Sequence, residues 1–262
     1  MIHLKSAAEI DQMAAAGAIV AATLAAVEAA IVPGATTADL DALAEDLIHE
    51  RGGTPTFKGY RGFPASICSS PNAMVVHGIP GEYAAVAGDV ISVDVGVTLD
   101  GFVADSASTF PVGEVSTEAR ALLTICQDAL AAGIAAAQPG NRIGDISAAV
   151  QQVTEDGGFS VIRTLVGHGV GRSMHEEPQV PNFGEAARGP TLRVGMTIAI
   201  EPMITAGGPD VAVADDGWSI STVDDSLSAH FEHTVAITDD GPRVLTVPRA
   251  AESEQAEATL LR

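Results

Sequence analysis

The sequence predicts an α/β domain built from two related halves, with helices flanking a shared sheet. Three features recur along the chain: a Pro-Gly pair, a Gly-Gly pair, and a carboxylate that follows a glycine at the same separation. They are Pro33-Gly34 and Pro139-Gly140, Gly52-Gly53 and Gly157-Gly158, Asp94 and Glu201. Their separations of 106, 105 and 107 residues nearly agree, which indicates a duplicated unit. Asp94 and Glu201 are therefore expected to approach one pseudo-two-fold axis from opposite halves.

Each half is expected to begin with two helices. Large apolar side chains at three- and four-residue spacings predict a helix over about residues 6–31. Thr37 is expected to cap a second helix that runs to about Glu50. In the second half, Thr117 opens a helix to about Ala137, and another follows to about Asp156. The halves then cover about residues 1–112 and 113–250 of a single domain, and residues 251–262 form a short C-terminal tail.

The segment from Met13 to Val32 is nearly all apolar and long enough to raise the question of a membrane span. Most of it is alanine, and Glu28 lies inside it. Its larger side chains form a stripe, which indicates an amphipathic helix packed on a core. We therefore expect no membrane partner.

The stretch from Val90 to Asp105 predicts a β-hairpin. β-Branched residues alternate along it, and Asp100-Gly101 supplies the turn. Folding back at that turn places Asp94 and Asp105 within a residue or two of each other, among apolar neighbours. Two ionised carboxylates held together in apolar surroundings require a compensating cation. The hairpin is therefore either one wall of a metal site or an ordinary edge hairpin with solvated aspartates.

The composition is strongly acidic, with a formal net charge of −21 over 262 residues. Such a surface repels phosphate backbones, so DNA and other nucleic acids are poor candidate partners. Cys68 and Cys126 are the only cysteines in the sequence, which fits a reducing compartment. Acidic residues lie where a signal peptide would begin its apolar region. We therefore expect a cytoplasmic protein.

The second half adds further candidate ligands. His168 stands between Gly167 and Gly169, a sterically open setting that suits a ligand, although a lone histidine is more often structural. Glu201 and Glu232 accompany apolar strands. Carboxylates with an imidazole suit Mn, Fe, Co or Zn, and the lack of cysteine ligands argues against a structural zinc site. Two ions about 3.5–4 Å apart that share bridging carboxylates would form a hydrolytic centre.

Several short motifs occur in a distinctive order along the chain. They are His77-Gly78-Ile79-Pro80, Asp94, Asp105, Gly167-His168-Gly169, His175-Glu176-Glu177-Pro178, Ile200-Glu201-Pro202-Met203 and Glu232-His233-Thr234. This set resembles the type I methionine aminopeptidases of the pita-bread fold, over nearly the whole chain. Aminopeptidase P, prolidase and creatinase relatives share the ligand order. The stretches Asp216-Gly217-Trp218 and Ser226-Leu227-Ser228-Ala229, together with the short length, favour the methionine group.

The resemblance implies a fold, a metal centre and a set of catalytic roles. The fold would be a central antiparallel sheet flanked by two pairs of helices in one catalytic domain. Asp94 would bind one divalent ion, His168 and Glu201 would bind the other, and Asp105 and Glu232 would touch both. Glu201 would also be the general base. For the two remaining histidines, the resemblance implies that His175 stabilises the oxyanion and that His77 contacts the scissile amide.

The resemblance also implies a methionine pocket and a monovalent-cation site. The pocket positions are Tyr60, Phe63, Cys68, Met174 and Trp218. A thioether gains from burial and from sulfur–aromatic contacts in such a pocket. The alternative is that several of these residues only pack the core. Asn72 and Ser228 match the monovalent-cation site.

The activity implied by the resemblance is removal of the initiator methionine from nascent polypeptides whose second residue is small. The enzyme would be a cytoplasmic monomer with two divalent ions (Co, Mn, Fe or Zn), and the ribosome exit region is a further expected partner. Two alternatives stay open: an Xaa-Pro aminopeptidase or prolidase-like peptidase, and a non-catalytic protein that keeps the fold.

Overall fold

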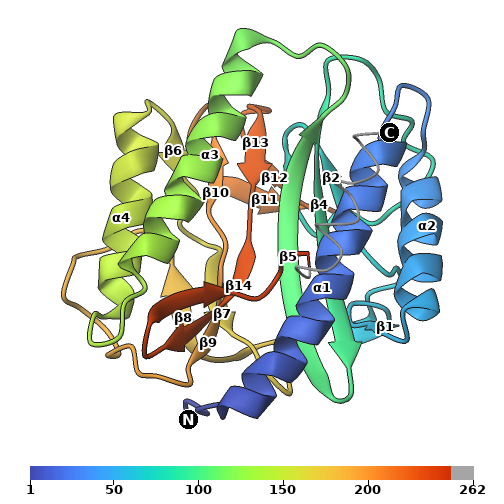
Figure 1. The fold of residues 1–262 in the computed structure, drawn as a ribbon. Coiled ribbons are helices and arrows are strands. Elements are labelled where there is room, and N and C mark those ends of the chain that lie inside the picture. Colours follow the sequence, from blue (N-terminus) through green and yellow to red (C-terminus); the bar gives the residue numbers. More distant parts are fainter. Residues whose placement is uncertain (249–262) are drawn as a thin grey trace, which may run out of the picture.

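Four α-helices flank antiparallel strands in the computed structural model, which describes residues 1–248 (Figure 1). The expected C-terminal tail, residues 251–262, lies outside the described residues. Helices α1 (Ala7–Ala30) and α2 (Thr37–Glu50) form one pair, and α3 (Thr117–Ala136) and α4 (Ile143–Asp156) form the other. The two pairs lie on opposite sides of the view, with the strands between them. The predicted α/β architecture is therefore confirmed, and its division into related halves stays a prediction.

The cap of α2 differs from the prediction, because Thr36 and not Thr37 is the capping residue. The Thr36 hydroxyl accepts the Asp39 backbone N–H at 3.1 Å, and the Asp39 carboxylate accepts the Thr36 N–H at 3.2 Å. This reciprocal pair is a capping box, which requires an acidic or amide side chain three residues after the cap. Thr37 is the first helical residue, and its hydroxyl donates to the Gly81 carbonyl instead.

Helices α1 and α3 are each long and apolar enough to cross a bilayer, by length and composition alone. Such helices also occur in the cores of water-soluble proteins. Helix α1 packs on two long strands, and Met13, Val20 and Val27 on this helix are fully buried. Burial of these large side chains against the sheet is the arrangement that the apolar stripe predicts.

The sheet of the first half is built on the long hairpin β4 (Val90–Leu99) and β5 (Phe102–Pro111), with β1 (Thr54–Pro55) and β2 (Cys68–Pro71) also paired to β4. Asp105 lies opposite Gly96, and Asp94 lies opposite Ala107. Because residues two apart share a face of a strand, Asp94 and Asp105 project from the same face of the hairpin. The predicted proximity of the two aspartates is confirmed.

The largest sheet of the second half has the strand order β15-β14-β9-β7-β8. Its strands are β7 (Val166–Gly169), β8 (Glu176–Pro181), β9 (Thr197–Ile200), β14 (His233–Thr238) and β15 (Gly241–Val244). Ile200 at the end of β9 pairs with His233 at the start of β14. Glu201, which follows β9, and Glu232, which precedes β14, therefore lie at the same end of these two neighbouring strands.

Shorter elements complete the described fold. One three-stranded sheet has the order β13-β10-β6, and another has the order β11-β12-β3. Their bounds, with that of the 3₁₀ turn η1, are β3 (Met74–Val76), β6 (Ser160–Val161), β10 (Met203–Thr205), β11 (Val211–Val213), β12 (Ile220–Thr222), β13 (Ser228–His230) and η1 (Tyr60–Gly62).

Strand β5 and the chain around β13 and β14 join the two halves. The Glu232 backbone N–H donates to the Ala107 carbonyl at 2.9 Å, and the Thr109 hydroxyl donates to the His230 carbonyl at 2.8 Å. These bonds place Asp105 from the first half directly beside Glu232 from the second. The fold thereby brings acidic residues together from positions more than a hundred residues apart.

Candidate metal centre and active site

Four carboxylates and one imidazole converge where the two halves meet. Asp94 comes from β4, Asp105 from β5, His168 from β7, and Glu201 and Glu232 from the ends of β9 and β14. Asp105 and Glu232 are only 2% and 1% exposed. Ligand atoms of Asp105, His168 and Glu232 all lie within 4.8 Å of one another. This group, drawn from β5, β7 and the residue before β14, could hold a metal ion.

The carboxylates lack the partners that buried anions need. Asp94 Oδ1, Asp105 Oδ1 and Glu232 Oε1 are buried and have no hydrogen-bond partner among the described residues. Burial raises the pKa of Asp94 to about 7. Burial, followed by repulsion from neighbouring carboxylates, raises the pKa values of Asp105, Glu201 and Glu232 well above their usual range. Orphaned oxygens in a cluster that resists ionisation fit a site completed by cations.

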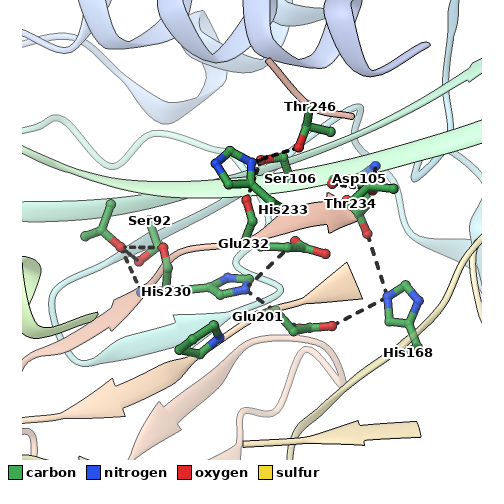
Figure 2. A network of polar contacts seen from close by, with 12 residues as sticks. Ser92, Asp105, Ser106, His168, Glu201, His230, Glu232, His233, Thr234 and Thr246 are labelled. Atoms are coloured by element: carbon green, nitrogen blue, oxygen red, sulfur yellow. Dashed lines mark hydrogen bonds and ion pairs between the residues drawn. The ribbon is translucent and has the colours of Figure 1, made fainter. Parts of the chain in front are cut away.

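His168 presents its Nε2 atom to this cluster. Its Nδ1 lies 2.9 Å from the Gly169 carbonyl oxygen, so donation from Nδ1–H leaves Nε2 free to bind a metal. Nε2 lies 3.5 Å from Glu201 Oε1 and 3.8 Å from Asp105 Oδ2 (Figure 2). Burial lowers the pKa of His168, which favours the neutral imidazole that metals require.

His168 lines the cavity, although the residue is only 8% exposed to solvent. A Cβ atom on Gly167 would collide with the Ala199 carbonyl, and one on Gly169 with the Glu177 carbonyl. The glycines therefore permit close approach of the adjacent strands, and this approach fixes the position of the imidazole.

His175 lies next to the cluster and is held by an aromatic neighbour. Its Nδ1 is 2.9 Å from the Tyr60 hydroxyl, and the two rings stack with centroids 5.5 Å apart. The His175 and His168 ring centroids are 4.2 Å apart. Although His175 is partly exposed to solvent, desolvation by its neighbours, followed by repulsion from His168, Arg61 and His77, lowers the pKa of its imidazole to about 4. His175 is therefore neutral near pH 7 and able to donate one hydrogen bond.

A cavity of about 320 Å³ opens onto these groups. Phe63 and Trp218 form an edge-to-face pair in its wall, with ring centroids 5.1 Å apart. Every residue expected in the divalent-metal centre, the catalytic set and the methionine pocket lines this one cavity: Tyr60, Phe63, Cys68, His77, Asp94, Asp105, His168, Met174, His175, Glu201, Trp218 and Glu232. The wall therefore combines acidic, imidazole and apolar surfaces.

Asn72 and Ser228, the residues expected at a monovalent-cation site, contact each other away from the lining of this cavity. The Ser228 hydroxyl donates to the Asn72 carbonyl at 2.9 Å, and the Asn72 side-chain amide donates to Asp89 Oδ1 at 2.9 Å. Their role in cation binding stays a prediction.

Sequence reasoning missed His230, which is 2% exposed and lines the cavity. Its Nε2 lies 3.7 Å from Glu201 Oε2 and 4.0 Å from Glu232 Oε2. Burial, followed by the charge of His77, lowers the pKa of His230 to about 3. The available signal was its position two residues before Glu232, because alternate residues of an extended chain share a face.

Comparison with known proteins agrees with this geometry. The model of "Metallopeptidase family M24" matches residues 11–239. The methionine aminopeptidase of Clostridium perfringens is 50% identical over 247 residues, which are 94% of this chain and 99% of that protein. Methionine aminopeptidase 1 of Bacillus subtilis is 46% identical over 246 residues, with 94% and 99% of the two chains covered.

Solved structures show the same relationship. The methionine aminopeptidase of Thermotoga maritima superposes with a TM-score of 0.93 at 44% identity, covering 94% of this chain and all of that one. The prolidase of Pyrococcus furiosus gives a TM-score of 0.77 at 22% identity, covering 94% of this chain and 66% of that one. At this low identity, the similarity to the prolidase shows a shared fold alone.

Proposed function

This chain belongs to metallopeptidase family M24, and on that premise we propose that it is an aminopeptidase that removes N-terminal methionine with the aid of two divalent ions. The supporting observation is that the carboxylate and imidazole cluster shares one cavity with an apolar wall of Phe63, Met174 and Trp218. Hydrolytic groups and a pocket for an apolar side chain are thus adjacent. The relatives at 46–50% identity carry the name of this activity.

Five side chains are proposed to hold the two ions. Asp94 is assigned to one ion, His168 and Glu201 to the other, and Asp105 and Glu232 to both. Oxygen and imidazole donors suit Co, Mn, Fe or Zn. When bound, such ions supply Lewis-acid polarisation of the scissile carbonyl and acidify a water molecule.

The remaining chemistry is assigned to the protein itself. Glu201, which lines the cavity, accepts the proton of the attacking water on its carboxylate. Donation from the Tyr60 hydroxyl to His175 Nδ1 leaves a proton on Nε2, and this N–H stabilises the carbonyl oxygen as negative charge develops. His77, which lines the same cavity, contacts the scissile amide and assists departure of the new amine.

The apolar wall is proposed to select methionine. Tyr60, Phe63, Cys68, Met174 and Trp218 offer aromatic and sulfur contacts to a thioether side chain. The same proposal includes a preference for substrates whose second residue is small. It also includes action on nascent chains near the ribosome exit region by a monomeric, cytoplasmic enzyme. Asn72 and Ser228 are retained as a proposed monovalent-cation site.

Two rival functions remain to be tested. The likeness of fold to a prolidase makes an Xaa-Pro peptidase the first rival, whereas the aromatic and sulfur-containing wall of the cavity favours a methionine aminopeptidase. A non-catalytic protein that keeps the fold is disfavoured, because every expected divalent-metal ligand is present and faces the cavity.

The test is release of methionine from a Met-Ala-Ser peptide by purified protein supplied with Mn²⁺ or Co²⁺. We expect release by the wild-type protein and by Glu114→Gln, an exposed control, and a loss of at least about a hundredfold in Glu201→Gln. An Ala-Pro dipeptide is assayed in parallel. Cleavage of Ala-Pro in preference to Met-Ala-Ser would establish the prolidase-like rival, and cleavage of neither would remove the enzymatic assignment.

A further inference from the structure

His230 is a buried imidazole for which the chemistry proposed above has no use. It lies at the end of β13, is 2% exposed, and neither Nδ1 nor Nε2 has a hydrogen-bond partner among the described residues. A buried polar side chain without a partner is unfavourable and calls for an explanation. The imidazole also lines the cavity of the candidate metal centre, so a bound group in that cavity could satisfy it.

The backbone holds His230 firmly at this position. Its N–H donates to the Thr109 hydroxyl at 2.8 Å, and its carbonyl accepts from the same hydroxyl at 2.8 Å. Strand pairing places it opposite Met203, two residues beyond Glu201. The backbone of His230 is therefore anchored between β5 of the first half and β10 of the second.

Glu201 lies between two imidazoles (Figure 2). On one side Oε1 is 3.5 Å from His168 Nε2, and on the other Oε2 is 3.7 Å from His230 Nε2. The Nε2 atom of His230 thus lies at almost the same distance from a Glu201 carboxylate oxygen as does the Nε2 atom of the expected ligand His168. Its Nε2 is also 4.0 Å from Glu232 Oε2, as His168 Nε2 is 3.8 Å from Asp105 Oδ2.

These separations distinguish ligation from direct hydrogen bonding. An N–H···O hydrogen bond joins heavy atoms at about 2.7–3.2 Å, so His230 bonds directly to neither carboxylate. Two donor atoms that each lie about 2.0–2.2 Å from one cation are separated by roughly 3–4 Å. The distances from His230 to Glu201 and Glu232 fall in the second range.

We propose that His230 is a second imidazole ligand of the metal centre, acting beside Glu201 and Glu232 and on the opposite side of Glu201 from His168. The inference rests on the proposed metal-dependent function and extends the ligand set from five side chains to six. An additional nitrogen donor favours Co²⁺ and Zn²⁺ over Mn²⁺, because imidazole suits the former ions while carboxylate and water ligands suit the latter.

The test counts the histidines bound to Co²⁺ by proton NMR of the wild-type protein. Ligating imidazoles give strongly shifted ring N–H signals, and burial slows their exchange with water. Two such signals are expected in the wild type and one in His230→Gln. His49→Gln, which changes an exposed histidine on α2, should retain both. The wild-type spectrum alone is decisive even where the His230 variant does not fold.

Metal affinity supplies an independent readout. Titration calorimetry should show Co²⁺ binding about tenfold weaker in His230→Gln than in the wild type and His49→Gln, with a smaller change for Mn²⁺. A wild-type protein that binds Co²⁺ with one imidazole signal would overturn the assignment of His230 and leave the proposed function standing. A wild-type protein that binds neither ion would overturn both.

Discussion

Asp105 and Thr234 are joined by two hydrogen bonds across the boundary between the halves. The Asp105 N–H donates to Thr234 Oγ1 at 2.9 Å, and Thr234 Oγ1 donates to the Asp105 carbonyl at 2.8 Å. One hydroxyl thus fixes the backbone of a candidate ligand from the first half to the strand that follows Glu232. Both residues are buried, so water cannot replace these bonds.

Substitution of Thr234 by valine should therefore destabilise the protein. The change keeps the shape of the side chain but leaves the Asp105 N–H and carbonyl unpaired, which costs about 1–3 kcal/mol for such a buried group. Chemical denaturation should show this loss in the free energy of unfolding. Thr124→Val, on the exposed face of α3, should stay within about 0.5 kcal/mol of the wild type. Equal stability of the two variants would contradict this account of the boundary.

Without metal, the protein should lose stability as the pH rises. The pKa of Asp94 is raised from 3.8 in the unfolded chain to about 7 in the fold, and those of Asp105, Glu201 and Glu232 are raised as well. The folded state therefore holds these protons more tightly, and the stability is lost between about pH 4 and pH 7 or above. Calorimetry with a chelator should give a lower Tm at pH 8 than at pH 5.

The acidic surface would act in the same direction, so these scans need high salt to screen exposed charges. The cluster is then tested by Glu232→Gln, which removes one carboxylate and should reduce the pH-dependent fall in Tm. Added Mn²⁺ should restore Tm at pH 8 in the wild type. If Tm falls equally with pH in the chelated wild type and the chelated Glu232→Gln variant, the carboxylate cluster is not the source of the pH dependence.

Lys5 and Glu176 form an ion pair that connects the N-terminal segment to the first residue of β8. Lys5 Nζ lies 2.5 Å from Glu176 Oε2, and their side chains are 6% and 10% exposed. The other oxygen, Oε1, accepts the backbone N–H groups of Arg172 and Ser173. Lys5→Met would leave the carboxylate without its cation and should cost roughly 3 kcal/mol of stability.

The matched control is the only other lysine in the sequence, Lys58, which pairs with Glu45 on the surface. Lys58→Met should cost much less stability than Lys5→Met, because exposed ion pairs contribute little. Denaturant titrations of the two variants provide the comparison. A Lys5 variant as stable as the Lys58 variant would show that the pair is energetically unimportant.

Trp218 is expected to contribute to selection of methionine. It packs edge-to-face on Phe63 in the cavity wall, and an aromatic contact of this kind is worth about 1 kcal/mol beyond burial. Trp218→Leu should raise KM for Met-Ala-Ser about five- to tenfold with a smaller change in kcat. Because Trp218 is the only tryptophan in the sequence, free methionine should also alter the fluorescence of the wild-type protein. An unchanged KM would remove Trp218 from the proposed pocket.

Much of this arrangement could be predicted from local sequence patterns. The spacing of large apolar residues predicted α1 closely, and the Asp100-Gly101 turn placed Asp94 near Asp105. These patterns work because turn geometry and helix periodicity act over a few residues. The convergence of Asp94 and Glu201 required the internal repeat and the resemblance, since no local pattern links residues so far apart.

Other features were not predictable in this way. Lys5 and Glu176 are 171 positions apart, and neither belongs to a pattern that indicates pairing. His230 was missed because its position two residues before Glu232 was not used, and its backbone bonds to Thr109 and its pairing with Met203 place it near Glu201. The cap at Thr36 was misplaced by one residue because two adjacent threonines can each cap a helix, and Asp39 decides between them.

The central claim is that acidic side chains from both halves meet around two cations. Anomalous diffraction from crystals soaked in Mn²⁺ tests it most directly. Two anomalous peaks are expected in the cavity, one near Asp94 and one near His168 and Glu201, with Asp105 and Glu232 between them. Crystals that show no peak among these residues at saturating Mn²⁺ would contradict the account.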